Sequence, residues 1–174
     1  MSLHVVIALM SGAAAACVLR RIGDTASGQG FNRELSTMTR LQSETQRSLN
    51  RIRVLLVEDC PDQLRLYANT LVSAGADVTL ECDGASALAT VLRPNANFDV
   101  VVTDLQMPVM DGQQAIIAMR HVGIELPIVV ISASQETNIE AKMLESGCTR
   151  FLHKPIKPKL LIEEVRASLE QSVA

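Results

Sequence analysis

Aromatic residues are scarce in this chain of 174 residues, which has three Phe, one Tyr and no Trp. The core must therefore be aliphatic, and the aromatic side chains on which nucleic-acid bases stack are nearly absent. No basic cluster lies beyond the first third of the chain, and the net charge is −3. These absences argue against a direct nucleic-acid partner.

The cysteines also lack a recognisable pattern. They lie at positions 17, 60, 82 and 148, without a CxxC or other spacing typical of a metal or redox site. A reduced, cytoplasmic setting is the simplest expectation. The start, Met-Ser-Leu-His, has no Lys or Arg, which disfavours a secretory signal peptide.

Charge and composition divide the chain near residue 50. Residues 1–50 hold five Arg against three acids, or +2, whereas residues 51–174 hold eleven Lys and Arg against sixteen acids, or −5. The length suits one full domain with a small appendage. We therefore predict an apolar segment over 1–22, a linker and helical connector over 23–50, and a folded domain over 51–174.

The apolar run over 3–19 ends at Arg20-Arg21 and has 17 residues, the lower limit for crossing a bilayer. If it spans, the arginine pair would hold the rest of the chain at the inner face of the membrane. A helix packed on a neighbouring protein and a piece of a larger upstream domain are equally open interpretations. In the connector, Gly28-Gln-Gly30 does not follow a strand and is a weak dinucleotide-binding signal.

From Arg51 onward, short apolar runs alternate with helical patterns. Several runs, such as Ile128-Val-Val-Ile131, are continuously apolar, as expected when helices cover both faces of a sheet. Five βα units predict an α/β fold, a doubly wound five-stranded parallel sheet with an N-terminal helical appendage. The expected strands are 52–57, 77–81, 99–103, 127–131 and 149–152, and the expected helices are 62–74, 84–93, 112–120, 135–146 and 157–170.

Four of the apolar runs are followed by polar groups suited to a phosphate and a divalent cation. Parallel sheets bind ligands outside the carboxyl ends of their strands. By position alone, one site at this edge should contain Glu58, Asp59, Asp104, Ser132 and Lys154.

The chemistry of this group follows from charge. Two carboxylates, Asp59 and Asp104, repel each other unless a cation lies between them, and hard oxygen ligands favour Mg²⁺. A free oxygen of Asp104 could then attack phosphorus and form an acyl phosphate. Lys154 and Ser132 could stabilise the oxygens of the transferring group.

Each residue also has a structural interpretation. An acid after a strand often caps a helix, and Lys154 could be a surface charge. We expect Asp111 to cap the following helix, Pro108 to fix the loop after Asp104, and Gly112 to permit a tight turn. Capping alone does not readily account for such groups at four strand ends.

Together these residues resemble the receiver domain of two-component response regulators, the CheY-like superfamily. The pattern comprises Glu58-Asp59, Asp104 with Pro108 and Gly112, Ser132-Ala133 and Lys154-Pro155, and the resemblance covers residues 51–172. It implies a flavodoxin-like fold that accepts phosphate from a phosphohistidine on a histidine kinase or a histidine phosphotransfer protein. It also implies a signalling phosphoacceptor rather than an enzyme.

The resemblance implies a role for each matching residue. Asp104 resembles the phosphoacceptor, Asp59 the direct Mg²⁺ ligand and Glu58 an acid that holds the metal through water. The backbone carbonyl of Gln106 completes the ligands, and a cis bond joins Lys154 to Pro155. Ser132 and Phe151 resemble the switch pair, which would alter the partner-binding face over 135–170. Serine in place of threonine and phenylalanine in place of tyrosine are departures from the family that keep phosphoryl acceptance intact.

Three alternatives remain beside a lone receiver. The chain could be the receiver portion of a hybrid histidine kinase. A haloacid-dehalogenase-like phosphatase also uses an aspartate nucleophile, but Gln106 stands where such enzymes carry a second acid. A non-phosphorylated interaction module would be expected to lack Asp59, Asp104 or Lys154, and all three are present.

Overall fold

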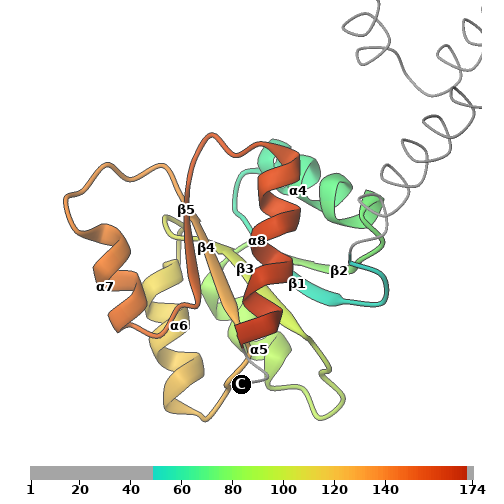
Figure 1. The fold of residues 1–174 in the computed structure, drawn as a ribbon. Helices are drawn as coiled ribbons and strands as arrows, with labels where there is room; N and C mark the ends of the chain where they lie inside the picture. Colours follow the sequence, from blue (N-terminus) through green and yellow to red (C-terminus); the bar gives the residue numbers. More distant parts are fainter. Residues whose placement is uncertain (1–48, 172–174) are drawn as a thin grey trace, which may run out of the picture. The chain divides into compact units, whose positions relative to one another are not determined.

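The computed structural model describes residues 49–171 (Figure 1). The hypothesis of a membrane anchor over 3–19, and that of a connector over 23–50 except for its last two residues, lie outside the described residues. Within 49–171, the helices are too short or too polar to span a bilayer.

Residues 53–171 form five βα units. The strands are β1 (Arg53–Val57), β2 (Asp77–Glu81), β3 (Val100–Asp104), β4 (Ile128–Ser132) and β5 (Arg150–His153). The helices are α4 (Pro61–Ser73), α5 (Gly84–Val91), α6 (Gly112–His121), α7 (Ile139–Glu145) and α8 (Pro158–Gln171). All strand pairs are parallel, in the order β2-β1-β3-β4-β5. The predicted α/β fold with a five-stranded parallel sheet is confirmed, whereas the predicted N-terminal helical appendage lies outside the described residues.

The central strands are continuously apolar because each face of the sheet has its own helical layer (Figure 1). Alternate residues of a strand point to opposite faces. Thus Val54 and Leu56 of β1 pack with α4 and α8, whereas Leu55 and Val57 pack with α5, α6 and α7. Leu49, within the segment predicted as a connector, is also fully buried in the α4–α8 layer.

Two expected boundaries differ in a way that affects the site. Asp104 and Ser132 are the last residues of β3 and β4, not the first residues after them. The helix expected over 135–146 begins only at Ile139. Asn138 has a positive φ of 68°, which a continuing α-helix cannot accommodate, and the backbone N–H of Glu136 donates to the Ser134 hydroxyl. A loop over 133–138 therefore borders the carboxyl end of β4.

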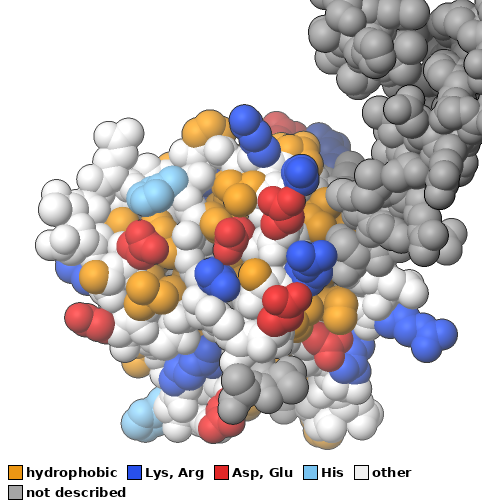
Figure 2. All heavy atoms as spheres, in the orientation of Figure 1, with side chains coloured by type: hydrophobic (Ala, Val, Ile, Leu, Met, Phe, Trp, Pro, Cys, Tyr) orange, Lys and Arg blue, Asp and Glu red, His pale blue; other side chains and the backbone are white. Residues whose placement is uncertain are grey.

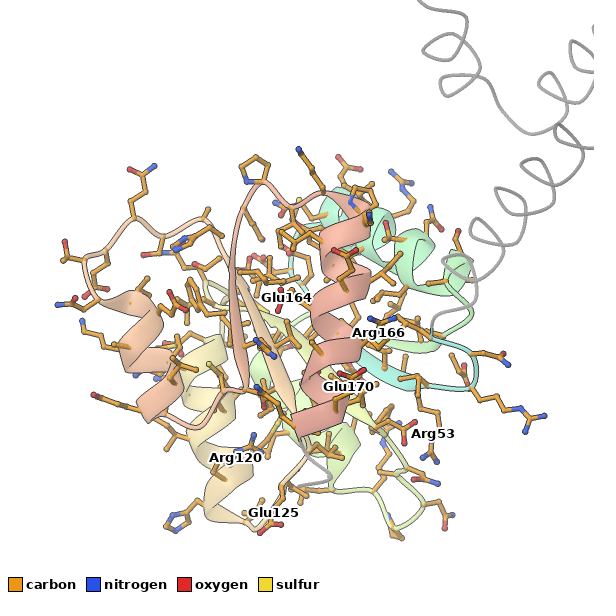
Figure 3. The ribbon with its side chains drawn as sticks, viewed as in Figure 1. Arg53, Arg120, Glu125, Glu164, Arg166 and Glu170 are labelled. Atoms are coloured by element: carbon orange, nitrogen blue, oxygen red, sulfur yellow. The ribbon has the colours of Figure 1, made fainter. Side chains whose placement is uncertain are left out.

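Side-chain hydrogen bonds hold both ends of α6. Asp111 caps α6 and forms a capping box with Gln114, as the sequence predicts for Asp111. Near the other end of α6, the Arg120 guanidinium donates to the carbonyls of Ile124, Leu126 and Gly147 (Figure 3). Arg120 thereby links α6 to the loop before β4 and to the loop after α7.

The surface around α8 carries charges of both signs. Figure 2 shows acidic and basic side chains interspersed with apolar ones over this face. The exposed pairs Lys159–Glu163 and Arg166–Glu170 lie along the helix.

Candidate functional site

Three acids from two strand ends meet at one edge of the sheet. One carboxylate oxygen from each of Glu58, Asp59 and Asp104 lies within 4.8 Å of the others. β1 and β3 are adjacent parallel strands, with Val57 paired with Thr103, so the residues that follow Val57 lie beside Asp104. Glu58 and Asp104 are buried, at 2% and 7% exposure, whereas Asp59 is exposed.

Lys154 joins this acidic group from the end of β5. Its Nζ donates to Asp104 Oδ2 at 2.7 Å and to Glu58 Oε2 at 2.9 Å, and its side chain is only 11% exposed. The Lys154–Pro155 peptide bond is cis, as the family resemblance implies. A surface role for Lys154 is therefore excluded, because its ammonium lies between two buried carboxylates.

The charges alter one another's protonation. Burial raises the pKa of Glu58 above its ordinary value of 4.5, and the hydrogen bond from Lys154 offsets only part of that rise. Burial lowers the pKa of Lys154, but its hydrogen bonds to Asp104 and Glu58 and the charges of those two acids together outweigh burial, so its pKa is raised above the ordinary value of 10.5. Lys154 is therefore a permanent cation in this site at neutral pH.

The backbone around Asp104 fixes its carboxylate. The N–H of Leu105 donates to Asp104 Oδ1 at 2.6 Å, and the N–H of Gln106 approaches the same oxygen at 3.4 Å. Oδ2 instead receives Lys154. The two oxygens are thus in different environments, because one is held by backbone donors and the other by a side-chain cation.

Gly112 allows this arrangement for a different reason from the tight turn expected. A Cβ on Gly112 would overlap the carbonyl oxygen of Asp104 and lie 2.9 Å from Leu105 Cα. The N–H of Gly112 also donates to the carbonyl of Leu105. Gly112 is therefore required by close backbone approach beside Asp104.

The remaining predicted residues surround the acids less directly. Ser132 is fully buried, and its Oγ accepts the N–H of Ser134 at 3.0 Å. Within residues 49–171, no hydrogen bond joins that hydroxyl to Asp104 or Lys154. Gln106 is exposed in the loop after β3. Phe151 is half-buried and packs edge-on against the His153 ring, with the two ring centroids 5.0 Å apart.

One residue beside the site, Tyr67, and one residue in the loop after Asp104, Val109, are not among the residues predicted. The ring of Tyr67, from α4, is 5% exposed and has Lys154 Nζ 6.0 Å from its centroid. Val109, 87% exposed, has a φ of 67°, which is unusual for a β-branched residue. A lone Tyr in an amphipathic helix and a Val in a loop carry no sequence signal for either feature.

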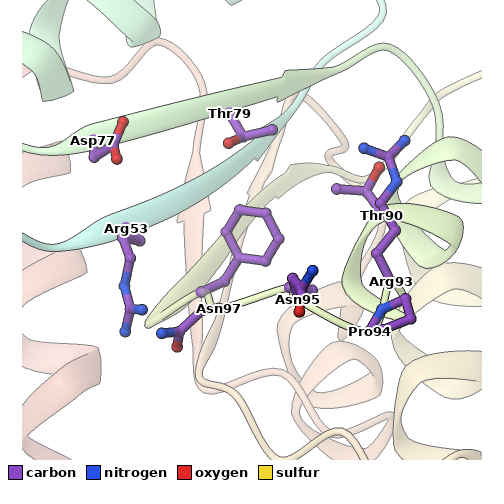
Figure 4. Close-up of a pocket in the computed structure, with 10 residues that line it drawn as sticks. Arg53, Asp77, Thr79, Thr90, Arg93, Pro94, Asn95 and Asn97 are labelled. Carbon is purple, nitrogen blue, oxygen red and sulfur yellow. The ribbon is translucent and has the colours of Figure 1, made fainter.

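A separate cavity lies at the opposite end of the strands. It has a volume of about 490 Å³, and its lining includes Arg53, Thr79, Arg93 and Asn97 (Figure 4). The bidentate pair of Arg53 with Asp99 stabilises this end of the sheet, and the pair lowers the pKa of Asp99. None of the three clustered acids lines this cavity.

The residues present fit a divalent cation. The three carboxylates offer only oxygen atoms, and two of the acids are buried close enough to repel each other. Mg²⁺ binds through carboxylates, waters and phosphate oxygens in such sites, whereas zinc favours His and Cys. The site thus combines three acids suited to a divalent cation, a carboxylate oriented by backbone donors and a fixed ammonium.

Comparison with known proteins agrees with this geometry. Residues 54–166 match the family model described as the response regulator receiver domain. Histidine kinase 1 of Arabidopsis thaliana is 33% identical over 72% of this chain and 13% of its own length. The transcriptional regulatory protein PrrA of Mycobacterium leprae is 36% identical over 68% of this chain and 50% of its own length. The chain thus spans half or less of these curated relatives.

Solved structures show the same fold. The receiver domain of the Francisella response regulator 1452 superposes with a TM-score of 0.65 at 29% identity, over 70% of this chain and 99% of that chain. A sensor protein from Polaromonas has a TM-score of 0.64 at 32% identity, over 70% of this chain and 98% of its own. The fold described above is therefore that of solved receiver domains.

Proposed function

Because the chain belongs to the response regulator receiver domain family, we propose that Asp104 accepts a phosphoryl group from a phosphohistidine in a Mg²⁺-dependent reaction. The observation that carries this assignment is the group of three carboxylates within 4.8 Å, with Lys154 bound to Asp104. An oxygen of Asp104 attacks phosphorus, the bond from phosphorus to the donor nitrogen breaks, and the imidazole leaves with a proton. The product is an acyl phosphate.

Each residue has a defined part in this reaction. Glu58, Asp59, Asp104 and the backbone carbonyl of Gln106 would hold Mg²⁺, which supplies positive charge to the phosphoryl oxygens. Leu105 N–H orients Asp104 through Oδ1. Lys154 carries a positive charge 2.7 Å from Oδ2, where charge develops on the transferring group.

Signalling requires a change that reaches the surface. Phosphorylation adds about −1.5 to −2 charge and new acceptor oxygens beside Lys154. The Ser132 hydroxyl, which in the structure accepts the N–H of Ser134, would turn toward those oxygens. The loop over 133–138 and Phe151 would then shift and alter the partner-binding face over 135–170. Phe151 already lies half-buried against the core that includes α7.

The phosphoryl group would be lost slowly through attack by water. Gln106 and Ser134 stand in the loops that follow β3 and β4, where they would influence the approach of that water. Gln106 stands two residues after Asp104, at the position where a haloacid-dehalogenase-like phosphatase would carry its second acid. We expect self-dephosphorylation at most, and not turnover of small phosphate esters.

A second arrangement is supported by the matches to histidine kinases. Histidine kinase 1 of Arabidopsis thaliana matches this chain over only 13% of its length. The same receiver chemistry could thus operate within a hybrid histidine kinase. In that case the donor would be a phosphohistidine of the same larger protein or of a phosphotransfer protein.

Phosphoryl transfer can be tested on the full-length chain with acetyl phosphate and Mg²⁺. Intact mass spectrometry should show one added phosphoryl group, sensitive to hydroxylamine as an acyl phosphate is. Asp104→Asn should abolish the addition, whereas the control Asp77→Asn, on β2, should not. Undiminished labelling of Asp104→Asn would refute the assignment, as would labelling that does not require a divalent cation.

A further inference from the structure

The one tyrosine of the chain lies beside the lysine of the proposed site. Tyr67 belongs to α4 and is 5% exposed within the cluster that joins α4, α8 and the central strands. α4 and the connection from β5 to α8 lie at the same end of the sheet (Figure 1). Lys154 Nζ lies over the Tyr67 ring, 6.0 Å from its centroid.

We propose that Tyr67 is a positioning residue for phosphoryl transfer, holding the Lys154 ammonium in place through the face of its ring. This inference rests on the proposed function of Asp104. The face of an aromatic ring carries negative potential and attracts a cation at about this distance, more strongly when water is excluded. Both partners meet the second condition, since the Lys154 side chain is only 11% exposed.

Packing makes the ring a fixed partner. Leu71 lies one turn further along α4 and is fully buried in the same cluster, together with Leu161 and Val165 of α8. A ring enclosed by two helices and the sheet has little freedom to rotate, because cores pack side chains closely. The Lys154 ammonium is therefore held between two carboxylates and an aromatic ring whose own position is fixed by packing.

The ring differs from the carboxylates in one respect that matters for the reaction. Glu58 and Asp104 also belong to the acid group that would bind a cation. Once a cation neutralises part of their charge, their attraction for Lys154 weakens. The potential of the Tyr67 ring does not depend on that neutralisation. Tyr67 thus remains a partner of Lys154 while the acids are engaged elsewhere.

The hydroxyl of Tyr67 is not needed for this role. Within residues 49–171, no hydrogen bond of that hydroxyl accompanies the ring contact. Phenylalanine retains the ring face, whereas leucine retains only an apolar volume. Tyr67→Phe and Tyr67→Leu therefore separate the ring from simple core packing.

The functional test is the rate of phosphorylation of the full-length chain by acetyl phosphate at saturating Mg²⁺. Tyr67→Leu should lower this rate roughly 30-fold, the factor that one desolvated cation–π contact corresponds to. Tyr67→Phe should restore nearly the wild-type rate. Leu71→Val is the control, because it loosens the same cluster without touching Lys154, and its rate should match the wild type.

The contact itself can be measured without phosphorylation. Because the chain has one Tyr and no Trp, tyrosine fluorescence reports Tyr67 alone. Lys154→Met should change the intensity of this emission in metal-free protein, whereas Lys159→Met, at an exposed site on α8, should leave it unchanged.

The outcomes separate this inference from the proposed function. If the wild type takes no phosphoryl group, the proposed function fails. If the wild type is labelled and Tyr67→Leu is labelled equally fast, or Leu71→Val is slowed as much as Tyr67→Leu, the positioning role of the ring is wrong. Failure of Tyr67→Phe to restore the rate would also overturn it, since the hydroxyl would then be required. Unchanged emission in Lys154→Met would exclude the contact.

Discussion

Replacing Lys154 with methionine would test the electrostatic balance of the site most directly. The change preserves most of the side-chain length and removes a charge that lies 2.7 Å from Asp104 and 2.9 Å from Glu58. The side chains of those two acids are only 9% and 2% exposed. Removing one partner of a buried ion pair costs about 3–5 kcal/mol, because the remaining charge keeps its desolvation cost without its attraction.

This loss in the free energy of unfolding is expected in the absence of divalent cations and should be measurable. A typical domain has a free energy of unfolding of about 5–15 kcal/mol, so a change of 3–5 kcal/mol is a large share of it. Exposed ion pairs contribute only about 0–1 kcal/mol. The matched control is Lys159→Met, because Lys159 is 75% exposed and lies 3.6 Å from Glu163. We expect that control to change stability by less than about 0.5 kcal/mol.

The effect of Lys154→Met should grow with pH. Burial already raises the pKa of Glu58 above 4.5, and loss of Lys154 removes a contact that lowers it. A carboxyl with a raised pKa in the folded state contributes stability below its unfolded pKa, and this contribution is lost as the pH rises through its folded pKa. The variant should therefore be closest to the wild type near pH 4.5 and fall further behind as the pH increases.

Urea unfolding followed by circular dichroism, with a chelator and then with millimolar Mg²⁺, would measure these effects. Since Lys154 is not a proposed ligand, Mg²⁺ should still bind, and it should stabilise the variant by neutralising the unpaired acids. A loss below about 1 kcal/mol at neutral pH without cations would refute the reasoning, because it would place Lys154 among exposed pairs. Loss of all Mg²⁺ stabilisation would contradict the division of roles.

Two further predictions concern the backbone beside Asp104 and the other end of the sheet. Gly112→Ala should destabilise the domain by more than about 2 kcal/mol and slow phosphorylation, because the new Cβ would overlap the Asp104 carbonyl oxygen. Urea unfolding and acetyl phosphate labelling would show this, and equal stability of the variant would contradict it. Asp99→Asn should lower the free energy of unfolding at neutral pH. The difference from the wild type should shrink as the pH falls through 3.8 and below. Pairing with Arg53 lowers the pKa of Asp99, so the stability that the pair contributes is lost when Asp99 is protonated. Urea midpoints across that range would test it against Asp62→Asn, from an exposed pair on α4 expected to have little effect; a constant difference at all pH values would exclude the ion pair as its source.

Much of the fold could be predicted because the central strands β1, β3 and β4 are short, mostly apolar and almost continuously buried. Each central strand is apolar on both faces, so its pattern alone indicates a sheet covered by two helical layers. Asp111 likewise combines with Gln114 in a local capping box, which depends on residues three apart. Local interactions of this kind can be predicted from the sequence alone.

The start of α7 could not be predicted in the same way. The sequence over 135–146 is compatible with a helix, but Asn138 adopts a left-handed conformation and the Ser134 hydroxyl accepts a backbone N–H. Side chains of Asn and Ser can compete with a helix for backbone hydrogen bonds. Whether they do so depends on how the loop must pass the end of β4.

By itself, the sequence determined which chemical groups stand at the ends of the parallel strands, because alternating βα units place all those ends at one edge. Glu58, Asp59, Asp104 and Lys154 could be assigned to one site on that ground. Tertiary structure alone decided which groups touch: Lys154 between two buried carboxylates, the Tyr67 ring near its ammonium, and Gly112 against the Asp104 backbone. These contacts join residues far apart in the chain, and their distances arise from how α4, α6 and the sheet pack, which no local pattern encodes.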